Sequence, residues 1–271
     1  MAEQTPMTLE NAPYEVLIKS NVAQSMAKNL HLTEVQIAKA NQSLLTLLTD
    51  PKLAKCSQGS KIRFAYATAL YDYKNPNAVA PVPYGDQVQA QLQYQAYIED
   101  MLACGRVLET NCVALYKGID YKGFVNQWGY KELVLPERIE LTDIFESKEV
   151  VGYYAFAKCD DGRVFTSLMS VSEIHEHANR YSKSYGVSDD KKNIWKDNFD
   201  KMARKTVIKA VARVVLQAYP FDRLAWALKL DQAVITENGF EYQDNPQNAP
   251  KETVDGQPQE SINNSLEKPT E

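Results

Sequence analysis

Four cations recur at every fourth position between residues 201 and 213, and this spacing places them along one side of an α-helix. They are Lys201, Lys205, Lys209 and Arg213. The segment 191–213 contains about eight Lys or Arg and two Asp, a local excess of roughly six positive charges. Evenly spaced cations beside a buried helix face suit a row of phosphates, so the segment predicts contact with a nucleic-acid backbone.

An apolar face lies beside these cations and predicts that the same segment is one long helix packed against a core. The apolar face consists of Trp195, Phe199, Met202, Ala203, Thr206, Val207, Ala210, Val211 and Val214. A water-facing surface would also explain a row of cations. Because no balancing acid follows Asp200 in the segment, phosphates are the favoured interpretation.

Other side chains could extend this contact to a single strand, whose bases stack on aromatic rings while cations follow the phosphates. The candidate DNA-binding residues outside the row of four cations are Lys61, Arg63, Gln91, Tyr94, Tyr97, Arg106, Lys117 and Arg204. The tyrosines could equally pack against a sheet, and each isolated cation could be an ordinary surface charge.

The net charge of −5 over 271 residues does not exclude an acidic ligand, because the acids are concentrated at one end. From residue 236 to 271 about eight acids face two lysines, so this stretch carries roughly −6 and the remainder about +1. The stretch is rich in Asn, Gln, Pro, Glu and Ser, a composition that predicts disorder. We therefore expect a flexible arm over residues 1–30, a folded core over 31–235 and a disordered acidic tail over 236–271.

Several activities lack their sequence signatures. The chain has neither a G-x-x-x-x-G-K-[ST] nor a G-x-G-x-x-G motif, so no ATP requirement is expected. His175 and His177 point in different directions on a helix and cannot grip one metal ion. The acid pairs Asp160–Asp161 and Asp189–Asp190 leave a metal-dependent nuclease open as an alternative, although the first pair is typical of a turn. We expect no cofactor, with Mg²⁺ as a modulator at most.

The expected fold is α+β: a β-hairpin-rich antiparallel sheet packed with helices. Capping boxes at Thr33 and Ser170 predict that a helix begins at each position. Further helices are expected over 60–70, 94–105, 191–213 and 222–234. Hairpins are expected over 78–93, 106–125 and 149–169. Widely spaced cysteines and the lack of a long apolar run predict a cytoplasmic protein.

Three segments of the chain resemble the RecT family of phage and prophage single-strand annealing proteins, and they follow one another in the same order as in that family. Trp195 followed by Met202-Ala203-Arg204-Lys205-Thr206 is similar to the family's W…M-A-K-K-T segment. The segment 82–107, VPYGDQVQAQLQYQAYIEDMLACGRV, resembles the family's P-[FY]…Q-L…G-Y segment, and 150–157, VVGYYAFA, resembles its V-x-G-x-Y-A strand. Gln93 and Ala96 stand where the family has glycines, and Arg204 replaces a lysine.

The resemblance implies a recombinase that anneals complementary single strands of DNA and promotes limited strand invasion without ATP or covalent chemistry. It also implies homo-oligomeric rings or helical filaments inside a bacterial host cell. The implied partners are a 5′-to-3′ exonuclease and a host single-strand-binding protein. Besides the nuclease, a structural assembly protein that does not bind DNA remains the alternative from a different class.

Overall fold

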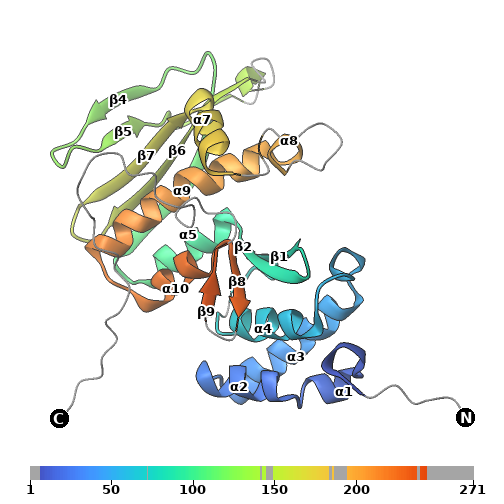
Figure 1. Cartoon of the computed structure of the whole chain (residues 1–271). Coiled ribbons are helices and arrows are strands. Elements are labelled where there is room, and N and C mark those ends of the chain that lie inside the picture. The colour runs from blue at the N-terminus through green and yellow to red at the C-terminus, as the bar shows by residue number, and fades with distance from the viewer. Residues whose placement is uncertain are drawn as a thin grey trace, which may run out of the picture.

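Helices and antiparallel strands are mixed throughout the protein, in agreement with an α+β fold (Figure 1). The computed structural model describes residues 7–71, 73–140, 142–144, 149–182, 185, 194–236 and 239–242. Lys191, Lys192 and the pair Asp189–Asp190 lie outside these ranges, as does the stretch from residue 243 onward.

The N-terminal quarter is helical and forms the lower part of the view in Figure 1. The elements are η1 (Leu9–Asn11), α1 (Tyr14–Leu17), α2 (Asn21–Asn29), α3 (Glu34–Thr49), η2 (Pro51–Leu53) and α4 (Gln58–Ala69). The Thr33 capping box is confirmed, because its hydroxyl accepts from the Gln36 amide and the Gln36 side chain accepts from the Thr33 amide.

The expectation of a loosely held arm over residues 1–30 is wrong for its described part. Residues 14–29 form two helices whose side chains Leu17 and Ala23 are each 1% exposed. The Tyr14 hydroxyl donates to the Asn41 carbonyl of α3 at 3.0 Å. The polar composition concealed this packing, because only one narrow face of these short helices is apolar.

One sheet has the strand order β1-β2-β8-β9, formed by β1 (Val79–Tyr84), β2 (Gln87–Leu92), β8 (Ala233–Thr236) and β9 (Gly239–Glu241). The hairpin expected over 78–93 is confirmed, and its turn contains Gly85 at a φ of +59°. Two expectations at the C-terminal end are wrong. The helix expected over 222–234 ends at Leu230 and is followed by β8, and β9 lies inside the supposed tail.

A second sheet has the order β3-β6-β7, formed by β3 (Val107–Tyr116), β6 (Val150–Cys159) and β7 (Val164–Ser170). The β6–β7 hairpin is confirmed. The expected return of residues 121–125 onto β3 is wrong, because β3 pairs with β6, whereas β4 (Lys122–Val125) pairs with β5 (Lys131–Val134). Proximity in the chain favours residues 121–125 as the partner of β3, but the distant strand β6 occupies that edge instead.

Further helices pack against these sheets or against one another, and α9 crosses β6 and β7 in the upper part of Figure 1. They are α5 (Tyr94–Ala103), α7 (Val171–Tyr181), α8 (Ile194–Asp197), α9 (Phe199–Ala218) and α10 (Asp222–Leu230). The single helix expected over 191–213 is interrupted at Asn198, whose φ of −137° and ψ of 39° are not helical. The Ser170 capping box of α7 is confirmed.

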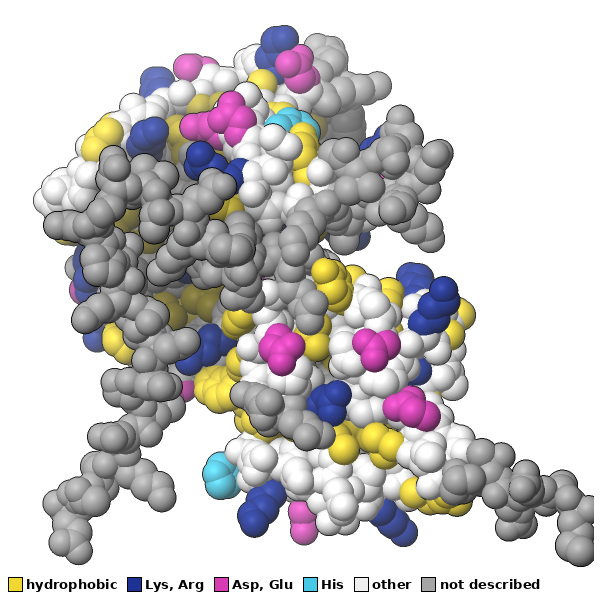
Figure 2. Space-filling model, viewed as in Figure 1, with side chains coloured by type: hydrophobic (Ala, Val, Ile, Leu, Met, Phe, Trp, Pro, Cys, Tyr) yellow, Lys and Arg dark blue, Asp and Glu magenta, His cyan; other side chains and the backbone are white. Residues whose placement is uncertain are grey.

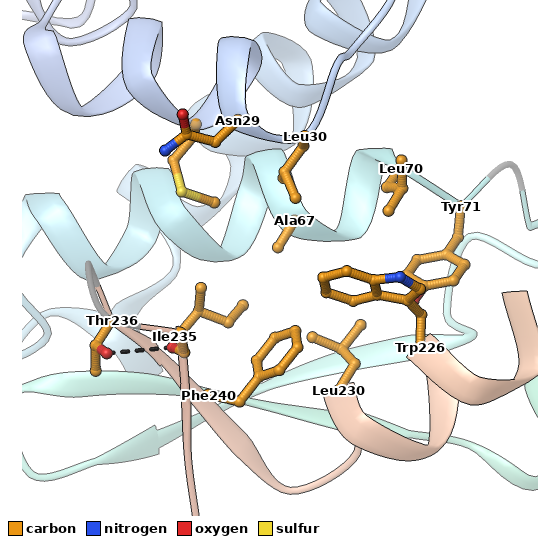
Figure 3. Close-up of a pocket in the computed structure, with 12 residues that line it drawn as sticks. Asn29, Leu30, Ala67, Leu70, Tyr71, Trp226, Leu230, Ile235, Thr236 and Phe240 are labelled. Atoms are coloured by element: carbon orange, nitrogen blue, oxygen red, sulfur yellow. Dashed lines mark hydrogen bonds between the residues drawn. The ribbon is translucent and has the colours of Figure 1, made fainter. Parts of the chain in front are cut away.

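An apolar pocket of about 150 Å³ lies where the N-terminal helices meet the C-terminal strands (Figure 3). In Figure 3, Leu30 and Ala67 face Trp226, Leu230 and Phe240 across this pocket. The Trp226 and Phe240 rings meet edge to face, with their centroids 5.3 Å apart. Residues far apart in the sequence therefore form one core, and β9 contributes to it.

Replacement of Leu17 by Ala tests whether the N-terminal helices are part of the folded core. We expect Leu17→Ala to lower the free energy of unfolding by about 2–5 kcal/mol, because it leaves a cavity. Val16→Ala is the matched control, since Val16 is 40% exposed and should change stability by at most about 0.5 kcal/mol. Equal denaturant midpoints for the two variants would contradict the packing of α1.

Two truncations test where the folded part ends. A chain that stops after Tyr242 keeps β9. We expect its melting temperature to match that of the full chain, because the removed residues include few apolar side chains. A chain that stops after Thr236 loses Phe240 and the β8–β9 pairing, so it should melt several degrees lower. Thermal unfolding of both chains measures this, and identical melting temperatures would refute a structural role for β9.

A candidate nucleic-acid interface between two sheets

A groove of about 980 Å³ lies between α9 and the β1-β2-β8-β9 sheet, and α7 and α10 also contribute to its walls. Its charged side chains are four cations and one carboxylate: Lys205, Lys209, Arg213, Lys229 and Asp231. Three of the cations come from α9, so the groove gathers most of the row recognised in the sequence. The excess of positive charge makes the groove a candidate for binding an anionic polymer.

The carboxylate of Asp231 is completely buried and joins three separate elements. Its Oδ1 atom accepts from Lys205 Nζ at 2.7 Å and from the Leu92 amide at 3.0 Å. Its Oδ2 atom accepts from Lys209 Nζ at 2.5 Å. Asp231 therefore connects α9 to the end of β2 and to the segment between α10 and β8.

Burial and charge act against each other on these groups. Burial alone would raise the pKa of Asp231, but the attraction of Lys205 and Lys209 outweighs it and holds the pKa well below its ordinary value. Burial and the nearby Lys209 lower the pKa of Lys205, whereas Asp231 raises it. The carboxylate stays ionised at neutral pH, where it neutralises one positive charge of the groove.

The outer part of the groove is more open. Arg213 is exposed, and neither it nor Lys229 forms an ion pair with any residue in the described ranges. His177 of α7 lies near Arg213 and Lys209, and burial, followed by repulsion from these two cations, lowers its pKa. Neutral His177 leaves Arg213 and Lys209 as the charged groups of this wall near pH 7.

The opposite wall is polar without being charged. Gln89 and Gln91 of β2 line the groove, whereas Val88 and Ala90 of the same strand belong to the core. This alternation gives β2 one face on the core and one face on the groove, as the period of two in a strand requires. Trp195, Tyr181 and Tyr242 add aromatic rings to the lining, so cations, amides and rings face one space.

The row of four cations does not form one exposed stripe. Lys201 is exposed on the first turn of α9 and does not line the groove, whereas the side chain of Lys205 is only 7% exposed. The side chain of Lys209 is 17% exposed. Spacing alone cannot distinguish the exposed lysine from the more buried ones, because the carboxylate that pairs with Lys205 is distant in the sequence.

Arg204, another candidate for phosphate contact, is held by the protein itself. Its Nε atom donates to Asp200 at 2.9 Å, and one terminal nitrogen donates to the Cys112 carbonyl of β3 at 2.6 Å. The guanidinium also lies 5.8 Å from the ring centroids of Tyr94 and Tyr153. These contacts join α9 to α5 and to the second sheet.

Lys61, Arg63 and Tyr97 are also held away from the groove. Lys61 is 3% exposed on α4, which packs against the core face of β2. Arg63 donates to the Ile235 carbonyl at 2.8 Å. Tyr97 has no exposed surface, and burial followed by the nearby Asp231 raises the pKa of its hydroxyl.

Two further candidates lie at opposite ends of β3, outside the groove. Arg106 pairs with Asp160 at 2.9 Å, and Lys117 pairs with Glu149 at the same distance. Arg163 and Tyr219 bind the neighbouring Asp161, so the Asp160–Asp161 pair is engaged by the protein rather than grouped for metal binding. Within the described ranges, no three His, Cys, Asp or Glu side chains converge to hold a metal ion.

The sequence did not predict that the charged residues Asp231 and Lys229 belong to the groove, and it did not place His177 there. The only signal for Asp231 was an isolated acid after an apolar helix end, which many helices have. Lys229 occupies the last turn of α10, where a cation also stabilises the helix dipole. Only the fold brings these residues to α9.

The positive charge of the groove is local. On the face drawn in Figure 2, Lys and Arg side chains are interspersed with Asp and Glu over both halves of the molecule. Among the described helices, none is long and apolar enough to span a membrane.

Comparison with known proteins agrees with the segments recognised in the sequence. The model of the RecT family matches residues 38–250. The uncharacterized protein YqaK of Bacillus subtilis (strain 168) is 32% identical over 177 residues, which make up 62% of this chain and 56% of that protein. The chain thus spans little more than half the length of this relative. Because the family model covers most of the chain, this protein belongs to the RecT family.

Proposed function

We propose that this protein binds single-stranded DNA in the groove between α9 and the β1-β2-β8-β9 sheet and anneals complementary strands during recombination. The observation that carries the proposal is the convergence of Lys209, Arg213 and Lys229 on one groove with a single, already neutralised carboxylate. Membership of the RecT family supports the same conclusion, since the family implies a single-strand annealing protein.

The chemistry asked of such a groove is modest. Base pairing and stacking drive annealing, so the protein has to offset phosphate repulsion and hold a strand with its bases accessible. Gln91 can donate and accept hydrogen bonds without reading a particular base, whereas Gln89 is buried and donates to the Gln232 carbonyl. The aromatic lining can stack on any base. No step requires a broken covalent bond, so we propose a DNA-binding protein without enzymatic activity.

The finer parts of the proposal follow from the family. We propose that annealing and limited strand invasion need no ATP, with Mg²⁺ modulating affinity at most. Repetition of the groove in a homo-oligomeric ring or filament would align many weak phosphate contacts along one strand. A phage 5′-to-3′ exonuclease would supply single strands, a host single-strand-binding protein would be the second partner, and the bacterial cytoplasm is the proposed location.

Strand annealing without nucleotide is the direct test of this function. Two complementary oligonucleotides carrying a fluorescence-transfer pair are added one after the other to the protein in the absence of ATP. We expect pairing faster than in buffer alone, because the bound strand has its charge partly neutralised. Pairing no faster than in buffer would remove the annealing function, and strand cleavage upon addition of Mg²⁺ would favour the nuclease instead.

Replacement of Arg213 by Ala tests whether the groove is the binding site. We expect weaker binding of single-stranded DNA and a slope of log affinity against log salt that is smaller by about 0.7, the value for one lost phosphate contact. Lys117→Ala is the matched control, because it also removes one exposed positive charge but lies beside Glu149, outside the groove. An equal change in both variants would show that net charge, and not the groove, governs binding.

A further inference from the structure

Lys205 and Lys209 contact the same carboxylate, yet they differ in what else they can reach. The Lys205 side chain is 7% exposed and the Asp231 side chain is fully buried, whereas Lys209 is 17% exposed. Lys209 is also one turn nearer to Arg213, which is open to solvent. Both lysines line the groove, but the ammonium group of Lys209 is the more accessible of the two to a ligand.

The charges of the three groups do not cancel. One carboxylate faces two ammonium groups, so the cluster retains one positive charge. A buried carboxylate is costly unless a cation balances it, and Lys205 is the cation buried with Asp231. The balance leaves the charge of Lys209 available, and the bond to Asp231 fixes where that charge lies in the groove.

From this geometry we infer that Lys205 is a positioning residue that acts on DNA through Asp231, and that Lys209 is the side chain that contacts phosphate. The inference rests on the proposed function, because the phosphate is that of a DNA strand. Lys205 neutralises Asp231 so that Asp231 can orient Lys209 without cancelling its charge. Without Lys205, the carboxylate of Asp231 would neutralise the positive charge of Lys209.

The alternative is that both lysines contact phosphates directly, as their spacing on α9 first indicated. The two arrangements differ in what happens when Asp231 is neutralised. If Lys205 touches DNA, its loss cannot be repaired by a change at Asp231. If Lys205 only balances Asp231, removal of the carboxylate makes Lys205 dispensable.

Two double variants separate these arrangements. Lys205→Met alone should weaken single-stranded DNA binding and reduce the salt slope by about 0.7. Adding Asp231→Asn should restore the slope to near that of the unsubstituted protein and recover most of the affinity, because Lys209 regains its charge although it loses the carboxylate that orients it. Replacement of both partners of a buried ion pair by uncharged side chains of similar volume is tolerated. The side-chain oxygen that remains after Asp231→Asn can still accept a hydrogen bond from the Leu92 amide.

The matched pair of variants replaces the other lysine, Lys209, with and without the same Asp231→Asn change. Lys209→Met should weaken binding to the same degree, and Lys209→Met with Asp231→Asn should stay weak, because the Lys205 side chain is only 7% exposed and lies too deep to replace Lys209 at a phosphate. Should either single variant fail to fold, the two double variants still decide, since only the one that retains Lys209 should bind. Thermal unfolding checks that the two double variants are folded.

The outcomes distinguish this inference from the function on which it rests. Rescue by Asp231→Asn in the Lys205→Met background alone supports the positioning role. Equal weakness of the two double variants, or equal rescue, would overturn it while the unsubstituted protein still binds DNA with a steep salt slope. Lack of DNA binding by the unsubstituted protein would instead overturn the proposed function, and the role of Lys205 toward DNA with it.

Discussion

The buried carboxylate of Asp231 is the constraint on which the groove depends. It accepts hydrogen bonds from Lys205, Lys209 and the amide of Leu92, which belong to α9 and β2. An ionised carboxylate out of water is unfavourable by several kcal/mol unless its partners stay in place. The cost of displacing any partner therefore keeps α9, β2 and the segment after α10 in one arrangement, and the groove is the space between them.

The same interaction reconciles an acidic protein with an anionic ligand. A net charge of −5 would repel DNA at long range, but screening in physiological salt limits that repulsion to about 8 Å. Within that range a strand bound as proposed would meet Lys209, Arg213 and Lys229, whereas the carboxylate of the lining is already paired. Local arrangement outweighs total charge, because Asp231 is already neutralised where it lies.

Local signals predicted the elements well, and long-range pairing is where prediction failed. The capping boxes at Thr33 and Ser170 and the hairpin turn at Gly85 involve residues within a few positions of one another, so spacing reveals them. The bond between Leu92 and Asp231 spans 139 residues, and that between Lys205 and Asp231 spans 26. No periodicity records such contacts, and so the groove residues on α9 could be predicted while the acid that organises them could not.

The geometry of the helix explains why four cations at regular spacing face different surroundings. An α-helix turns by about 100° per residue, so each step of four residues rotates the side chain by about 40°. Three such steps, from Lys201 to Arg213, rotate it by roughly 120°, which is wider than one face. The row therefore winds from solvent at Lys201, over the buried Lys205, to the open wall at Arg213. Contact of one strand with all four cations would require that the strand winds around α9, whereas a strand bound in the groove as proposed would meet only the second half of the row.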